Sequence, residues 1–184
     1  MRYALTLAAL LTTAGFSGLV TGSVLAYSAG AQTPATQPTS AALSLQITGD
    51  ARPATLTPAD IERQFSAQIK SLNYETKGKK HTSRVVPLLD VLQAYLPVFA
   101  PARKHPLLAV SVTVIGRDGY RTVLGLGEMM PDGANKGVYL ALDEDGKPLT
   151  GDAAPLNLLV LGDKAFGRWV HGIARLHLTD TATL

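Results

Sequence analysis

Residues 107–126, LLAVSVTVIGRDGYRTVLGL, give the clearest indication of the fold class. Its valines at positions 110, 112 and 114 alternate with Ser and Thr, and this period of two predicts a half-buried strand over residues 107–115. Arg117-Asp118-Gly119 has the composition of a tight turn, and residues 120–126 would return as the partner strand. The stretch therefore predicts an antiparallel hairpin within a β-rich domain.

Further strands are predicted on both sides of this hairpin, from alternation or from apolar runs bounded by Gly, Pro and Asp. They cover residues 43–48, 54–56, 65–76, 81–86, 137–142, 155–161 and 172–178. Two short helices are expected, over residues 57–64 and 87–96, the first with Thr57 as its N-cap and Pro58 in its first turn. Strands outnumber helices, so the predicted class is α+β, mostly β, with mixed or antiparallel sheets.

The first 31 residues have the layout of a secretory signal peptide. Arg2 is the only charged residue before Asp50, and the apolar run Ala4–Ala26 follows it. Ala29-Gly30-Ala31 then presents small residues at the two positions that a signal peptidase reads, so cleavage before Gln32 is favoured. An uncleaved membrane anchor is the alternative, because the run is long enough to span a bilayer. The prediction is a periplasmic or secreted protein that contacts the membrane only if this segment is uncleaved.

The rest of the chain is expected to form a leader and one domain. Residues 32–42 are rich in Pro, Thr and Ala and carry no charge, which predicts a disordered leader. The domain is expected over residues 43–179, and a chain of 184 residues has no room for a second full domain. Its apolar content of 46% supplies enough hydrophobic surface for a core.

Composition excludes several classes of function. The chain has no cysteine, which rules out a disulfide scaffold, a thiolate zinc site, an iron–sulfur cluster and a cysteine nucleophile. Its net charge of +3 is too small to indicate a nucleic-acid partner, and none is expected.

No single motif identifies catalytic residues or a metal site. The sequence lacks G-x-S-x-G and G-x-G-x-x-G, and its four histidines lack metal-binding spacing. The run Asp143-Glu144-Asp145-Gly146 is interpreted as a hairpin turn, because the glutamate that would complete a calcium loop is missing. The basic residues near the expected turn at Lys77–Lys80 are interpreted as solvated surface, with contact to an anion as the alternative.

A series of short motifs resembles the oxidoreductase molybdopterin-binding domain of the sulfite oxidase family, above all its small exported members. The resemblance covers roughly Leu43 to Leu178 and rests on the order of the motifs. They are Val86-Pro87-Leu88-Leu89-Asp90-Val91-Leu92, Asp118-Gly119-Tyr120, Gly137-Val138-Tyr139-Leu140, Asp145-Gly146-Lys147-Pro148-Leu149, Ala154-Pro155-Leu156 and Arg168-Trp169-Val170.

This resemblance implies the family's fold with an altered site. Catalytic members bind molybdenum through a cysteine between the first strands and the Val-Pro-Leu helix, and residues 72–86 contain none here. Asp152 and Asn157 occupy the positions of the family's pterin-contacting His and Arg, and Arg168 occupies that of the closing lysine. No cofactor is expected, and molybdopterin is implied by the resemblance alone.

The function that follows is an exported accessory module that binds a ligand or a partner without molybdenum redox catalysis. One alternative is a genuine molybdopterin-dependent oxidoreductase. Another is a subunit that binds a protein partner in a periplasmic signalling or redox pathway.

The resemblance also implies where a ligand would bind. The family's pocket opens between three segments, which are here Lys77–Arg84, Asp152–Asn157 and Lys164–His171. If their cations converge, the pocket suits a small anion or a carboxylate of a protein partner. Trp169 is expected in the core against Leu88, Leu92 and the strand over residues 155–161. The candidate binding residues are Lys80, His81, Arg84, Asp152, Asn157 and Arg168.

Overall fold

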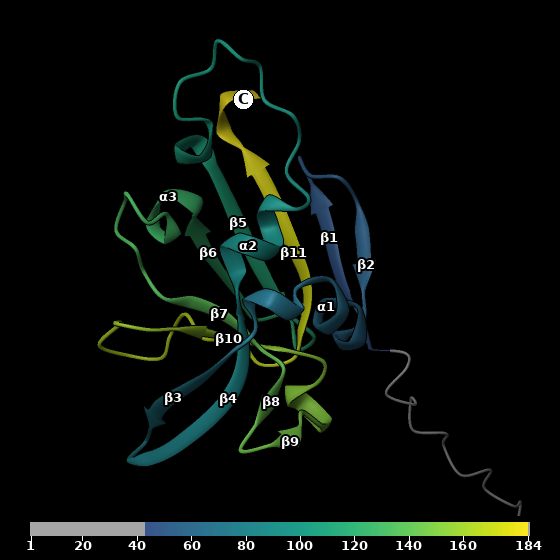
Figure 1. The fold of residues 1–184 in the computed structure, drawn as a ribbon, viewed down its shortest axis with the longest axis vertical. Helices are drawn as coiled ribbons and strands as arrows, with labels where there is room; N and C mark the ends of the chain where they lie inside the picture. Colours follow the sequence, from purple (N-terminus) through teal and green to yellow (C-terminus); the bar gives the residue numbers. More distant parts are fainter. Residues whose placement is uncertain (1–42, 184) are drawn as a thin grey trace, which may run out of the picture. The chain divides into compact units, whose positions relative to one another are not determined.

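The hairpin expected over residues 107–126 lies in a five-stranded mixed sheet (Figure 1). Its strands β5 (Val110–Gly116) and β6 (Arg121–Gly125) pair antiparallel, and β5 buries every second side chain. The remaining strands are β1 (Leu45–Gly49), β2 (Ala54–Leu56) and β11 (Ile173–Asp180), and the sheet order is β2-β1-β11-β5-β6. The β1–β11 pairing is parallel and the others are antiparallel, which makes the sheet mixed.

The structure is a computed structural model and describes residues 43–183. The predicted signal peptide and leader lie outside these residues. Within residues 43–183, no helix has both the length and the apolar character needed to cross a membrane.

A second sheet of four antiparallel strands carries the long β3–β4 hairpin, which projects to the lower left in Figure 1. Its order is β10-β7-β4-β3. These strands are β3 (Lys70–Thr76), β4 (Lys79–Pro87), β7 (Val138–Ala141) and β10 (Asn157–Val160). A two-stranded ladder of β8 (Asp143–Glu144) and β9 (Lys147–Pro148) contacts β4. The protein is therefore α+β and mostly β, as the sequence predicts.

The helices are short. They are α1 (Pro58–Gln64), α2 (Leu88–Gln93) and α3 (Leu126–Met129), with 3-10 turns η2 (Ser66–Gln68), η3 (Pro106–Ala109), η4 (Gly151–Ala153) and η5 (Thr181–Thr183). The predicted capping of α1 is confirmed: Thr57 Oγ1 accepts from the Asp60 amide at 3.1 Å, and Asp60 Oδ2 accepts from the Thr57 amide at 3.0 Å.

Several element predictions are wrong in their bounds. The strand expected from Leu107 begins only at Val110, because residues 106–109 form η3. The strand expected from Phe65 begins only at Lys70, because buried Phe65 ends α1 and residues 66–68 form η2. The helix expected over residues 87–96 ends at Gln93, where the chain turns toward Pro97. The strand expected over residues 120–126 ends at Gly125 because α3 starts at Leu126, a helix that apolar alternation did not reveal.

The main core lies between the two sheets and the helices. It combines Val112 and Leu176 of the five-stranded sheet, Ile61 and Leu92 of the helices, and Leu158 of the four-stranded sheet. A smaller cluster of Val85, Ala141 and Leu159 lies on the other face of the four-stranded sheet, because neighbouring strand residues point to opposite faces. Trp169, from the connection between β10 and β11, packs on both clusters and so covers part of this second face.

Candidate functional site: an aromatic groove

The three segments implied by the family resemblance line one groove on the second face of the four-stranded sheet. Its volume is about 560 Å³. Lys77 and His81 come from the first segment and Asn157 from the second. The third segment contributes Phe166, Trp169 and His171. The tertiary structure thus brings together residues separated by more than 90 positions in the chain.

Most of the predicted cations do not line this groove, because alternate residues of β4 face opposite sides of the sheet. His81 shares a face with Ser83 and Val85, whereas Lys80 and Arg84 project from the other face. Lys80 is exposed, opposite Glu75 of β3. The condition that these cations converge is therefore not met, and a small-anion ligand remains a prediction without converging cations to support it.

Arg84 is paired with two acids on its own side of the sheet. Its Nη2 donates to Glu62 Oε1 at 2.8 Å, and its Nε donates to Asp143 Oδ2. The Arg84 amide also donates to Asp143 Oδ1 at 2.8 Å. The hydrogen bond to Asp143, followed by the charge of Glu62, raises the pKa of Arg84. Arg84 therefore joins β4 to α1 and β8.

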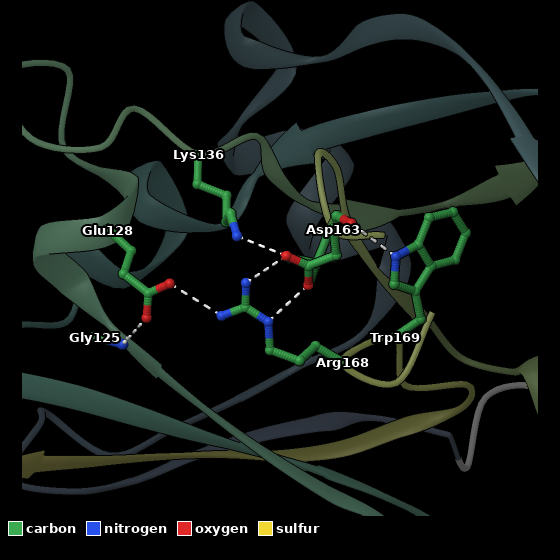
Figure 2. Close-up of polar contacts among 7 residues, drawn as sticks. Gly125, Glu128, Lys136, Asp163, Arg168 and Trp169 are labelled. Carbon is green, nitrogen blue, oxygen red and sulfur yellow. Dashed lines mark hydrogen bonds and ion pairs between the residues drawn. The ribbon is translucent and has the colours of Figure 1, made fainter. Parts of the chain in front are cut away.

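Arg168 is paired still more completely, as Figure 2 shows. Its Nε and Nη2 donate to the two oxygens of Asp163 at 2.7 Å each, a bidentate fork, and its Nη1 donates to Glu128 at 3.0 Å. Lys136 adds a second cation to Asp163 at 2.6 Å. The adjacent Trp169 indole points away from this cluster and donates to the Val160 carbonyl at 2.8 Å (Figure 2).

The pKa values of the cluster follow from these contacts. The hydrogen bond from Arg168, then that from Lys136, holds the pKa of Asp163 well below its ordinary value of 3.8. Burial alone would raise the pKa of Glu128, but hydrogen bonds from Arg168 and the Gly125 amide lower it. The hydrogen bonds to Asp163 and then Glu128 raise the pKa of Arg168. All three groups stay ionised at neutral pH and satisfy one another.

The two remaining candidates differ in their surroundings. Asp152 is exposed in η4 and is not among the residues that line the groove. Asn157 lines the groove but is buried, and its Oδ1 accepts from the Gly172 amide at 3.0 Å. That hydrogen bond ties the start of β10 to the start of β11, so Asn157 has a structural role there.

The walls of the groove are four aromatic side chains: Tyr74, Tyr120, Phe166 and Trp169. Of these, only Trp169 had a packing role predicted from the sequence, and Tyr120 appeared only within a motif of the family resemblance. Tyr120 stands in the Asp-Gly-Tyr turn, and Tyr74 alternates with exposed residues of β3, a pattern common in half-buried strands. No local sequence pattern indicated that these four aromatic side chains would lie on one surface.

Trp169 lies at the edge of the core rather than inside it. The indole is half-buried against both apolar clusters, the larger of which includes Leu88 and Leu92. Its hydrogen bond to Val160 attaches it to β10, the strand against which it was expected to pack. It therefore has both a structural contact and a surface open to the groove.

The polar side chains on the groove are mixed in charge. Glu144 accepts from the Tyr74 hydroxyl at 3.0 Å, and Asp118 accepts from the Tyr120 amide at 2.9 Å. Burial, together with the neighbouring Glu144, raises the pKa of Tyr74 to about 12, so its phenol stays neutral. Lys77 is the one permanently charged cation among the lining residues.

This set fits molybdopterin poorly. The cofactor carries a phosphate and a dithiolene-bound metal, and such a group needs converging cations and a sulfur ligand. The groove offers two carboxylates against Lys77, and the sequence has no cysteine. Within residues 43–183, no three His, Asp or Glu side chains are grouped so that they could hold a metal ion.

The acidic run at β8 is a turn, as predicted. Asp145 and Gly146 have positive φ angles of 52° and 74° and connect β8 to β9. Asp145 Oδ2 also lies 3.1 Å from His81 Nδ1. The run thus fixes the end of the β3–β4 hairpin beside the groove.

The chain matches no protein-family model and no curated protein sequence. The fold and the groove define a class of protein: a mostly β, α+β domain with an aromatic groove on the second face of its four-stranded sheet.

Proposed function

We propose that the protein is an exported binding module that holds a ligand in the aromatic groove without molybdenum redox catalysis. One observation carries the proposal: three segments distant in sequence converge on a groove lined by four aromatic rings. Tyr120 and Phe166 are 47% and 44% exposed, and large aromatic side chains left at the surface of a concave site favour a binding role. Export is supported by the signal-peptide layout of residues 1–31.

The groups available favour binding over redox chemistry. The chain has no thiolate for a metal, and the two arginines at the predicted positions are each held by two carboxylates. The ion pairs of Arg168 also attach the groove to the rest of the domain, because Arg168 joins α3 to the connection that carries Phe166 and Trp169. A concave, aromatic surface held in this way is suited to selective binding.

The proposal is tested on full-length protein expressed with its own N-terminus and purified from the periplasm. Elemental analysis should find no stoichiometric molybdenum. Native mass spectrometry should find a small molecule that is retained by the wild type and lost from Phe166→Ala. Phe99→Ala is the matched control, because Phe99 lines a different surface hollow. Stoichiometric molybdenum would overturn the proposal in favour of an oxidoreductase, and identical spectra for all three proteins would remove the groove as the binding site.

A further inference from the structure

The rings of the groove are arranged as walls rather than as a flat platform. Trp169 meets Tyr74 at an interplanar angle of 68° with centroids 5.5 Å apart, and meets Phe166 at 74° and 5.0 Å. Tyr120 is held against the same connection by the hydrogen bond from its hydroxyl to the Gly167 carbonyl. His81 stacks on one face of Tyr74, with centroids 5.5 Å apart and an interplanar angle of 24°. The remaining faces and edges of rings at steep angles around a hollow can contact one bound group.

The electrostatics of the groove favour a cation. Aromatic faces carry negative potential, and two carboxylates, Asp118 and Glu144, stand on the same lining. The other polar groups that face it are Lys77, His81, His171 and Asn157. The lining Lys, Asp and Glu side chains together carry one net negative charge, because two carboxylates oppose Lys77. His81 itself lies between acids, 3.1 Å from Asp145 and 3.6 Å from Glu144.

The groove also has the size for an organic ion. Its volume of about 560 Å³ falls within the usual range for small-molecule sites. A metal ion or a bare ammonium has too little surface to contact several of the aromatic walls at once. A methylated ammonium carries its charge on a bulky, weakly hydrated group and gains most from several aromatic walls.

We propose that the groove binds a quaternary ammonium compound of the choline class, with the methylated head between Tyr74, Phe166 and Trp169 and with Glu144 nearby. This inference deepens the proposed function and rests on it. The ligand could be supplied as a free solute or as the headgroup of a lipid, and both sources share this chemistry.

The test uses Trp169, which is the only tryptophan of the chain, so its fluorescence reports on the groove alone. Choline chloride should change this fluorescence saturably, and calorimetry should give the same affinity. The neutral isostere 3,3-dimethylbutan-1-ol should bind about tenfold more weakly or worse, because it lacks the charge. Equal affinities for the two compounds would overturn the proposal.

Variants locate the site. Phe166→Ala and Glu144→Gln should each weaken choline binding by about fivefold or more, whereas Phe99→Ala should leave it unchanged. Circular dichroism and thermal melting verify that each variant is folded. Loss of binding in Phe99→Ala alone, or in none of the variants, contradicts the assignment.

The two sources are separated with phosphatidylcholine vesicles. If the protein sediments with the vesicles and choline prevents this, the ligand is the lipid headgroup. If the protein binds choline but does not sediment with the vesicles, the ligand is a free solute. If choline does not bind but retention of the copurified molecule still requires Phe166, the proposed ligand class is wrong and the proposed binding function stands. If both fail, both proposals fall.

Discussion

At the level of single residues, adjacent side chains often point to opposite sides of the backbone, and this determines which of them reach the groove. Arg168 and Trp169 are adjacent, yet the guanidinium enters an ion-pair cluster and the indole faces the groove. Lys80 and His81 divide in the same way across β4. A prediction that counts charges within a segment therefore overestimates how many of them share one surface.

Asp163 should make the free energy of unfolding depend on pH in the acidic range. Since the folded state lowers the pKa of Asp163, its stabilisation is complete above its ordinary value of 3.8 and is lost as the pH falls through the lower folded value. Asp163→Asn should destabilise the protein by about 1–2 kcal/mol at pH 7, and the difference from wild type should shrink below about pH 4. Urea unfolding at a series of pH values measures this.

The control for this experiment is Asp132→Asn. Asp132 is exposed and makes no ion pair within residues 43–183. Its substitution should leave stability near that of the wild type across the range. A constant difference between Asp163→Asn and wild type from pH 7 to pH 2.5 would show that the carboxylate does not act through its charge.

Trp169 should contribute to stability through both its ring and its N–H. Trp169→Ala should cost about 2–4 kcal/mol, below the roughly 3–5 kcal/mol of a fully buried ring, because the indole is half-buried. Trp169→Phe keeps much of the packing but loses the hydrogen bond to Val160, and should cost about 1 kcal/mol. Unfolding in urea, followed by circular dichroism, measures both; two variants as stable as wild type would reject the structural role.

At the scale of the element, the β3–β4 hairpin depends on two backbone positions. Lys77 and Gly78 have positive φ angles of 49° and 76°, the conformation of a two-residue turn whose twist matches that of the strands. The sequence predicted a turn over Lys77–Lys80, and the structure narrows it to this pair because β4 begins at Lys79. The turn places Lys77 and His81 beside the groove.

Gly78→Ala should destabilise the protein by about 1 kcal/mol through backbone strain alone, since nothing lies within 4 Å of the added Cβ. Gly167→Ala is the matched control, because its added Cβ also meets nothing within 4 Å and its φ is not positive. Thermal melting should separate the two variants. Equal melting temperatures would mean that the turn tolerates a side chain.

At the scale of the whole molecule, the groove exists because several connections meet at one sheet face. β3 supplies Tyr74, the β5–β6 turn supplies Tyr120, and the connection between β10 and β11 supplies Phe166 and Trp169. An isolated bridge between Leu158 and Val170 and the pairing of β11 with β5 hold that connection in place. The groove is thus a product of strand order.

The class of the fold and much of its local structure can be predicted from the sequence alone. The alternation in β5, the Asp145-Gly146 turn and the Thr57 cap of α1 all depend on residues within a few positions of one another. Such patterns are set by backbone geometry and by which face of an element meets the core, so they can be recognised locally. The absence of cysteine likewise needed no structure.

Which charges are paired and which aromatic rings lie together depends on the tertiary structure. Arg84 pairs with Asp143, which is 59 positions away, and Arg168 pairs with Glu128, which is 40 positions away. No periodicity in the sequence indicates either ion pair. Strand order and the path of the connections bring these partners together, and an ion pair forms wherever opposite charges then lie within reach. For the same reason the site is an aromatic groove and not a cationic pocket. Three of the four acids that pair with the arginines come from other parts of the chain, as do the tyrosines of the walls, whereas Asp163 lies only five positions from Arg168.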